Sequence, residues 1–226
     1  MPTAILIDGG FLLRRFRACY PGKDSTSPQV VAKTVFELAL GHLEEKSHRH
    51  DLYRIFFYDC PPLQKLAHFP ITRKSVNFAK TPQAIFRLAL HDELRKLRKV
   101  ALRLGHLMDN SEWKLKEGRL KQLLGGTLQF DALQDGDFEY VAAQKGVDMR
   151  IGLDIASLCF KKQVDQIVLV AGDSDFVPAA KLARREGTDF ILDPMWHPVH
   201  PSLHEHVDGV RSTCPNPAVG KGLASQ

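Results

Sequence analysis

The stretch Val164–Pro178, VDQIVLVAGDSDFVP, decides the fold. Its run Ile167–Ala171 is apolar and rich in β-branched residues, which is typical of a strand buried on both faces of a parallel sheet. The run stops at Gly172, and two carboxylates, Asp173 and Asp175, follow at once. Open α/β sheets bind their ligands at the carboxyl ends of such strands. The stretch therefore predicts a buried strand with an acidic site at its end.

The same pattern of a strand followed by a carboxylate occurs twice more. Ala4–Ile7 ends on Asp8, and Leu52–Tyr58 ends on Asp59. A last short strand is expected at Asp189–Leu192. Segments with apolar residues at helical spacing separate the strands, at about 28–46, 82–104, 149–161 and 176–186. Strands that alternate with helices predict a single α/β domain with a mainly parallel sheet.

The composition is that of an ordinary globular protein. Of the 226 residues, 44% are hydrophobic and 25% are charged, which argues against a disordered chain. No apolar stretch is long enough for a membrane span, and the start of the chain lacks the features of a signal peptide. Four scattered cysteines without a CxxC pair indicate reduced thiols, some of them buried. We therefore expect a cytoplasmic protein.

Acidic residues at matching strand and helix ends predict a metal site. Asp8, Asp173 and Asp175 follow strands, and Asp148 stands at the start of a helix. Carboxylates that converge on one edge of a sheet repel each other unless they bind a cation, and oxygen ligands favour Mg²⁺ or Mn²⁺. Such an ion polarises a phosphodiester and activates a water for in-line attack.

A plainer interpretation stands beside this one. Asp is a favoured N-cap, so Asp175 and Asp148 could each cap the helix that follows. Asp8 before two glycines could be an ordinary turn residue. Each explanation suffices for one residue, whereas the set as a whole favours a shared acidic site.

Three motifs together make the resemblance specific. They are Ile5–Gly9 (ILIDG), Lys145–Asp148 (KGVD) with Asp154 six residues on, and Ala171–Pro178 (AGDSDFVP). The sequence resembles the NYN domain family, the LabA-like branch of the PIN-like nuclease superfamily. The resemblance implies a three-layer α/β/α PIN-like (Rossmann-like) sandwich over residues 1–212. It also implies a metal-dependent ribonuclease. The pattern of the chain itself predicts a helical basic insertion around 63–138 within this domain and a flexible tail at 213–226.

The resemblance also assigns roles to particular residues. It implies that Asp8, Asp148, Asp173 and Asp175 are catalytic residues that bind Mg²⁺ or Mn²⁺. Asp154, Asp59 and Ser174 form a second tier of candidates, since Asp154 is turned about 120° from Asp148 on a regular helix. The family usually has Asn three residues after its first Asp, and this chain has Phe11 there.

Two other chemistries fit the sequence less well. Ser174 does not stand in a nucleophile elbow, and no His has a suggestive relation to it. The histidines at 197, 200, 204 and 206 do not follow the spacing of a zinc finger. We expect a hydroxyl beside the acids and solvated loop histidines.

The positive charge gathers on the segment that follows Thr81. The chain carries a formal net charge of +5, and the expected helix 82–104 bears many Lys and Arg. A basic rim beside an acidic metal centre would bind a polyanion such as RNA. The predicted RNA contacts are Arg95, Lys96, Arg98, Lys99 and Arg103.

The sequence thus leads to a principal hypothesis and two alternatives. The principal one is a metal-dependent ribonuclease. The first alternative, motivated by Phe11, is a non-catalytic module that binds RNA or a protein partner as an adaptor. A small phosphatase is a weaker possibility, because no DxD motif follows the first strand. A homo-oligomer is compatible with each of them.

Overall fold

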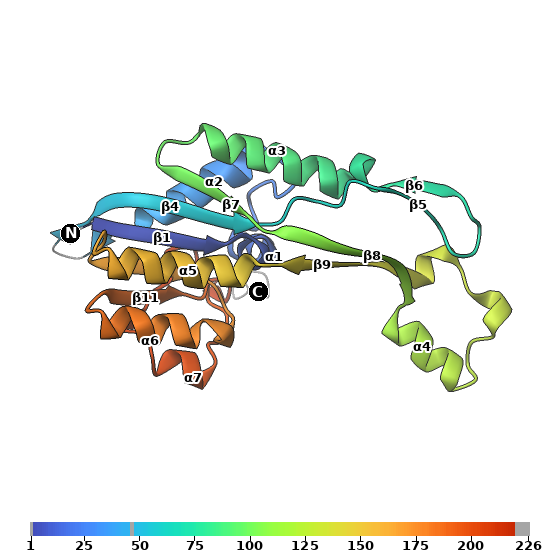
Figure 1. Ribbon diagram of the computed structural model, residues 1–226. Coiled ribbons are helices and arrows are strands. Elements are labelled where there is room, and N and C mark those ends of the chain that lie inside the picture. The colour runs from blue at the N-terminus through green and yellow to red at the C-terminus, as the bar shows by residue number, and fades with distance from the viewer. Residues whose placement is uncertain (1, 46–47, 220–226) are drawn as a thin grey trace.

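A six-stranded sheet, parallel throughout, forms the centre of the computed structural model, which describes residues 2–45 and 48–219 (Figure 1). The strand order is β12-β11-β10-β1-β4-β7. The bounds are β1 Pro2–Asp8, β4 Asp51–Asp59, β7 Val100–Leu104, β10 Gln166–Val170, β11 Asp189–Asp193 and β12 Gly209–Val210.

Helices cover both faces of this sheet and make three layers. On one face lie α1 (Gly9–Cys19), α2 (Pro28–Gly41) and α3 (Pro82–Lys96). On the other lie α5 (Val147–Phe160), α6 (Val177–Arg185) and α7 (Pro201–His204). Alternate residues of β1 enter the two cores, since Ile5 packs with the first group of helices and Leu6 with the second. The predicted three-layer α/β/α sandwich is confirmed.

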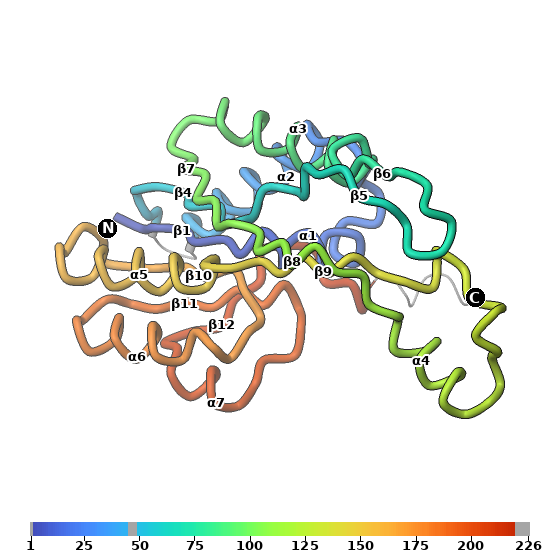
Figure 2. The backbone as a smooth tube through the Cα atoms, turned by 45° about the vertical axis from the view of Figure 1, so that its right-hand side comes forward, coloured from blue at the N-terminus to red at the C-terminus, as the bar shows by residue number. Residues whose placement is uncertain are grey.

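The direction of the chain reverses beside β1, which places a topological switch point at the centre of the sheet. From β1 the chain moves outward through β4 to β7, then returns to build β10, β11 and β12 on the other side (Figure 2). β1 and β10 are direct neighbours, with Ile7 opposite Val170. Their carboxyl ends therefore meet where doubly wound sheets bind ligands.

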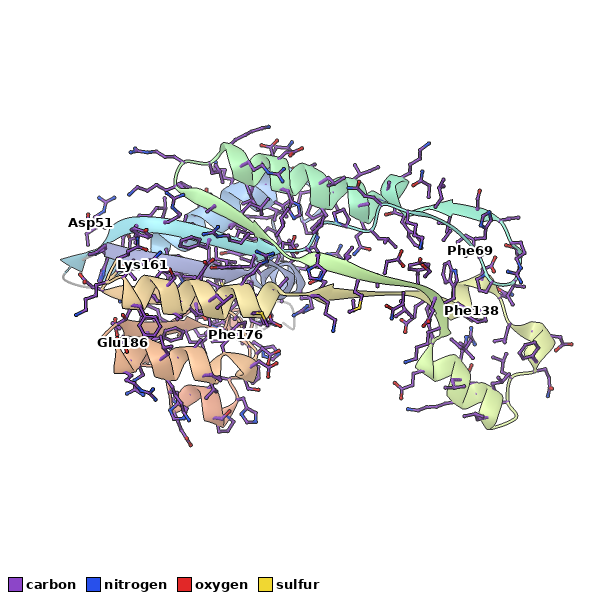
Figure 3. All side chains as sticks on the ribbon, in the orientation of Figure 1. Asp51, Phe69, Phe138, Lys161, Phe176 and Glu186 are labelled. Carbon is purple, nitrogen blue, oxygen red and sulfur yellow. The ribbon has the colours of Figure 1, made fainter. Side chains whose placement is uncertain are left out.

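Two hairpins project from the sandwich as an arm (Figure 1). One pairs β5 (Leu66–His68) with β6 (Ser75–Asn77), and the longer one pairs β8 (His106–Leu115) with β9 (Phe138–Lys145). The helix α4 (Glu117–Leu124) lies near the tip. An aromatic cluster joins the hairpins: Phe69, Phe78, Trp113 and Tyr140 have ring centroids 4.8 to 6.1 Å apart in successive contacts. Figure 3 shows Phe69 on the arm, well away from Phe176 in the sandwich core.

The remaining elements are short. They are the hairpin of β2 (Glu44–Glu45) with β3 (His48–Arg49) and the 3₁₀ turns η1 (Phe78–Lys80), η2 (Phe130–Ala132), η3 (Asp135–Asp137) and η4 (Ser174–Phe176).

The single helix predicted over 82–104 is wrong, because the segment holds a helix and a strand. The helix α3 begins with Pro82 in its first turn, where the Thr81 hydroxyl accepts the Ala84 amide, and it ends at Lys96. Lys99 takes a left-handed conformation with φ +63°, which turns the chain. Val100–Leu104 then pairs with β4 as β7. Apolar residues that alternate along a half-buried strand had fitted a helical period by coincidence.

The expected insertion at 63–138 is divided in the same way. Its middle part, α3 and β7, covers and extends the central sheet, whereas the residues on either side form the arm. At the start of the tail predicted at 213–226, two residues pack on the sandwich. Cys214 is buried, and the Thr213 hydroxyl donates to the Leu38 carbonyl at 3.1 Å. Residues 220–226 lie outside the described part of the chain.

Most other predicted elements are confirmed, with shifted ends. The helix expected at 28–46 ends at Gly41, and Gly187 closes α6 with φ +78° as a left-handed cap. All four cysteines are buried and free. Every helix in the described ranges is too short or too polar to cross a membrane.

The turn from β1 into α1 depends on Gly9. A Cβ at this position would lie 2.6 Å from the Phe57 ring and 2.7 Å from the Tyr58 carbonyl oxygen. We predict that Gly9→Ala lowers the free energy of unfolding by about 2 kcal/mol, because buried backbone and ring atoms cannot both withdraw. Urea denaturation measures the change. Gly152→Ala is the matched control: it meets nothing within 4 Å inside α5 and should stabilise by up to about 1 kcal/mol. Equal effects of the two changes would contradict the prediction.

Candidate functional site

Asp8 lies at the carboxyl end of β1 and is the N-cap of α1. Its Oδ1 accepts the Phe11 amide at 3.0 Å. The side chain is half-buried, and this burial raises the pKa of Asp8. The Phe11 amide and the Arg14 charge oppose the rise, whereas the charge of Asp148 adds to it. The ionised form of Asp8 is therefore disfavoured by its burial and by the neighbouring acid.

Asp148 enters the same edge from the other helical layer. It is in the first turn of α5, whose N-cap is Gly146 in a left-handed conformation with φ +78°. Partial burial raises the pKa of Asp148, and the charges of Asp173 and Asp175 raise it further. These like-charge effects link Asp148 to Asp8 on one side and to the GDSDF loop on the other.

Asp173 and Asp175 follow β10 at the switch point. Asp173 is the N-cap of η4, and its Oδ1 accepts the Asp175 amide at 3.1 Å. Asp8, Asp173 and Ser174 line one open cavity of about 840 Å³. The structure therefore brings Asp8 and Asp173 to a shared space. The charge of Asp148 acts on Asp8, and the charges of Asp173 and Asp175 act on Asp148.

Phe11 fixes the spacing between the two acidic loops. Its ring lies directly against Gly172, where an added Cβ would be only 2.4 Å from the ring. The other side of Phe11 meets His197 edge-on, with centroids 6.1 Å apart. In this chain a buried ring thus occupies the position at which the related family usually has Asn.

The N-caps proposed from the sequence, Asp175 and Asp148, are wrong, whereas Asp8 and Asp173 are N-caps. Asp175 does not cap the following helix, because the N-cap of α6 is Phe176; Asp173 is the N-cap of the turn η4 in front of it. Asp148 is not the N-cap of α5, which is Gly146. Asp8 does cap a helix, and that helix, α1, was not expected. The caps orient Asp8 and Asp173 but leave Asp148 and Asp175 without such a role.

The donor set suits Mg²⁺ or Mn²⁺ bound with much of its water. Over residues 2–45 and 48–219, no three His, Cys, Asp or Glu side chains are placed so that they alone could hold an ion. Mg²⁺ is commonly held by one or two carboxylates, with water and substrate phosphate completing its octahedron. Burial is the main cause of the raised pKa values of Asp8 and Asp148, and the charges of neighbouring acids add to it; a bound cation would relieve this second contribution.

Asp59 and Asp154 have structural partners. The Asp59 carboxylate is fully buried; it pairs with Arg87 and lies 2.7 Å from His91 Nε2. Burial raises the pKa of Asp59, but the hydrogen bonds and charge of His91 and Arg87 outweigh it, so the net shift is downward. Asp154 accepts the Tyr58 hydroxyl at 2.8 Å and pairs with Arg103 at 3.2 Å. Both acids therefore anchor the sandwich layers.

Most of the basic rim predicted beside the acids is in a different place. The turn at Leu97–Lys99 lies toward the amino ends of the strands, because the Lys99 carbonyl accepts the Ile55 amide in the middle of β4. Asp8 is about 13 Å further along the sheet. Arg95 and Lys96 pair with Asp92 and Glu93 on their own helix. Arg103 differs, because it stands opposite Tyr58 and therefore level with Asp8, where it pairs with Asp154. RNA contact by Arg95, Lys96, Arg98, Lys99 and Arg103 stays a prediction, and only Arg103 is near the carboxyl ends of the strands.

The sequence analysis missed four residues of the cavity. Arg14, Arg15, His197 and His200 line it together with Asp8 and Asp173. The two arginines project from α1, whose apolar residues Phe11, Leu12 and Phe16 were a usable helical signal. The Arg15 guanidinium donates to the Met195 carbonyl at 2.8 and 3.1 Å and so ties α1 to the loop that carries His197. The histidines belong to an irregular loop that no local pattern assigns to the cavity.

The family model of the NYN domain, a PIN-like nuclease family, matches residues 89–196. The matched segment includes Asp148, Asp173 and Asp175, whereas Asp8 lies before it. Among curated proteins no sequence matches the chain.

We predict that Asp8→Asn stabilises the metal-free protein at pH 7. Asn keeps the cap to Phe11 but removes a half-buried charge whose pKa is raised by burial and by Asp148. A raised folded-state pKa means that the charged form costs stability above about pH 4. The gain should therefore be present at pH 7 and disappear near pH 3, as measured by urea denaturation in EDTA. Asp131→Asn, an exposed change of the same charge, should have no effect, and a loss of stability in Asp8→Asn would refute the prediction.

Asp59 should show the opposite pH dependence. We predict that Asp59→Ala lowers the free energy of unfolding by about 3 kcal/mol at pH 7, because Arg87 and His91 lose a buried partner. Since the folded-state pKa of Asp59 is lowered, its stabilisation is complete above the ordinary value of 3.8 and is lost as the pH falls below it. The matched control is Asp92→Ala, which breaks an exposed pair with Arg95 and should cost less than about 1 kcal/mol. Similar losses in both variants would rule out the buried anchor.

Proposed function

Because the chain belongs to the NYN domain family of PIN-like nucleases, we propose that it hydrolyses RNA phosphodiester bonds with Mg²⁺ or Mn²⁺ held by Asp8, Asp148, Asp173 and Asp175. The observation that carries this proposal is the meeting of Asp8 and Asp173 in one cavity at the switch point. The like-charge coupling of Asp148 to both sides supports the same set of ligands.

Each acid has a separable part in the proposed reaction. A bound divalent ion would polarise the scissile phosphate and lower the pKa of the attacking water. Asp8 and Asp173 are the oriented ligands, since backbone amides fix their carboxylates at 3.0 and 3.1 Å. Asp148 and Asp175 accept no such hydrogen bond from a helix cap and are free to hold water or ion. Ser174 lines the cavity and could position a phosphate oxygen.

Arg14 is the cation best placed to attract the substrate. A Cβ added at Gly10 would lie 3.3 Å from an Asp8 carboxylate oxygen and 3.6 Å from an Arg14 nitrogen. Arg14 therefore stands beside the acids without neutralising them by an ion pair. A phosphate bound between Arg14 and a metal ion on Asp8 would have a positive charge on each side. Arg95, Lys96, Arg98 and Lys99 lie too far along the sheet to take this part, and we propose for them at most contacts with distant RNA. Arg87 and Arg103 lie nearer, but they pair with Asp59 and Asp154.

We propose the cytoplasm as the site of action. The four free, buried cysteines support a reducing compartment. The LabA-like branch of the family stays a prediction.

The second candidate is an adaptor that binds RNA or a protein without cleaving it. Phe11 in place of the usual Asn favours it, because the side chain has no carboxamide that could orient a water or a phosphate. The absence of three converging ligands in the described residues favours it as well. The adaptor should bind RNA in a salt-sensitive way and show no turnover with any divalent ion.

We predict that Asp173→Asn reduces Mn²⁺-dependent cleavage of single-stranded RNA by roughly a thousandfold, since a ligand charge is worth several kcal/mol in the transition state. Asn retains an oxygen for the Asp175 amide, so the fold should be preserved. Gel analysis of end-labelled RNA measures the rate, and calorimetry measures the metal-induced rise of the melting temperature.

The outcomes separate the two candidates. Ser174→Ala and Asp131→Asn are folded controls, and Asp131→Asn should retain full activity. Equal cleavage by Asp173→Asn and the parent protein would mean that the activity arises elsewhere. RNA binding by the parent protein without cleavage in Mg²⁺ or Mn²⁺ would establish the adaptor instead.

A further inference from the structure

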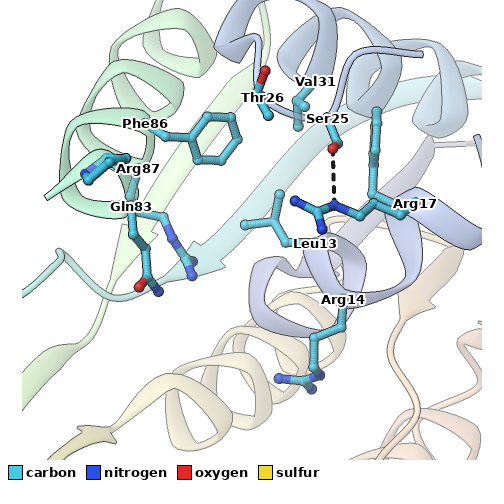
Figure 4. Close-up of a pocket in the computed structure, with 11 residues that line it drawn as sticks. Leu13, Arg14, Arg17, Ser25, Thr26, Val31, Gln83, Phe86 and Arg87 are labelled. Carbon is cyan, nitrogen blue, oxygen red and sulfur yellow. Dashed lines mark hydrogen bonds between the residues drawn. The ribbon is translucent and has the colours of Figure 1, made fainter. Parts of the chain in front are cut away.

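A second groove lies beside the acidic cavity, between α1, the loop after it and the first turns of α3 (Figure 4). Its volume is about 550 Å³, which is enough for one nucleotide unit. The lining residues come from three separate segments of the chain: Leu13, Arg14, Phe16 and Arg17; Ser25, Thr26 and Val31; and Pro82, Gln83, Phe86 and Arg87. None of the proposed metal ligands is among them.

Charge on the rim of this groove has one sign. Arg14, Arg17 and Arg87 line it, and no acidic side chain does. Two of the three are held in place: Arg17 Nε donates to the Ser25 hydroxyl at 3.1 Å, and Arg87 is fixed from below by the buried Asp59. Figure 4 shows the Arg17–Ser25 hydrogen bond and the Arg14 side chain at the end of the groove. Preset arginines in an open groove favour a phosphate ligand.

The floor of the groove is apolar. Leu13 and Pro82 contribute aliphatic surface, and Phe86 presents a half-buried ring. An apolar floor under a cationic rim matches a nucleotide, whose base stacks on an aromatic ring while its phosphate meets arginine. Every base has such a face, so contact of this kind does not select sequence.

Arg14 connects the groove with the acids. It lines both the groove and the cavity that contains Asp8 and Asp173. A strand of nucleic acid with one phosphate at the acids could therefore continue over Arg14 into the groove. A duplex could not do so with its base stacked on Phe86, because paired bases are not available for stacking on a protein ring.

We propose that the α1–α3 groove binds an unpaired nucleotide of the RNA substrate, next to the scissile phosphate, with its base on Phe86 and its phosphates on Arg14 and Arg17. The proposal rests on the proposed nuclease function for the direction of the strand, and it adds the place beside the acids where the substrate strand is held and the residues that hold it. Its test measures binding without turnover and so separates the two claims.

The experiment measures anisotropy of a fluorescein-labelled single-stranded 12-mer RNA in EDTA. Arg17→Glu should weaken binding about tenfold, and its salt dependence should fall by about 0.7 in the slope of log affinity against log salt, the value for one lost phosphate contact. Phe86→Leu keeps the apolar packing but removes the stacking ring, and should weaken binding about fivefold. A hairpin RNA without unpaired nucleotides should bind weakly to all proteins.

Arg185→Glu is the matched control, since Arg185 is exposed and lies in the last turn of α6, away from the groove. It should reproduce the parent affinity within a factor of two or so. Circular dichroism of each variant checks the fold, and the Phe86→Leu result stands on its own if Arg17→Glu unfolds.

The outcomes are decisive in either direction. Loss of affinity in both groove variants and not in Arg185→Glu supports the proposal, even if the parent protein cleaves nothing. Parent-like binding by both groove variants overturns it, even if cleavage through the acids is observed. Competition by a free mononucleotide, together with hairpin binding as tight as that of the single strand, would also overturn it in favour of a free-nucleotide site.

Discussion

Parallel pairing between β1 and β10 is the constraint on which the rest of the structure depends. Five residue pairs, from Thr3 with Gln166 to Ile7 with Val170, join two halves of a sheet that are far apart in the chain. Both strands are buried on both faces, so neither half has a closed core without the other. The pairing also sets the position of Asp8 relative to Asp173, and through it the width of the acidic cavity.

The carboxylates at the acidic edge of the sheet repel one another, and the local structure holds them in place despite this repulsion. Backbone amides hold the carboxylates of Asp8 and Asp173 in place, while burial and like charges raise the pKa values of Asp8 and Asp148. Phe11 keeps the two loops together by packing on Gly172, where only a hydrogen leaves room for the ring. Packing thus sets the distance between the two acidic loops.

Local patterns predicted the sandwich and its acidic edge because they depend on short runs. The apolar run at Ile167–Ala171 and the carboxylates after it are legible from sequence alone, and so is the cap at Gly187. The arm was not predictable, because β8 and β9 are half-exposed and held by an aromatic cluster contributed from distant positions. The end of α3 was missed because β7 mimics its spacing. The roles of Asp59, Arg14 and His197 depend on tertiary neighbours, which no local pattern contains.

The order of the strands has a consequence for the chain during synthesis. β1 is made early, but its partner β10 follows some 160 residues later, which at ordinary translation speeds is roughly 10 to 30 seconds. Throughout that interval β1 can pair only with β4 and presents an open, apolar edge. The Leu6 face also lacks its cover until α5 has been made. During this interval the nascent protein is therefore a half-sheet with an exposed apolar edge, which is prone to aggregation. Its yield in a cell should depend more on chaperones that shield such edges than on the stability of the finished fold.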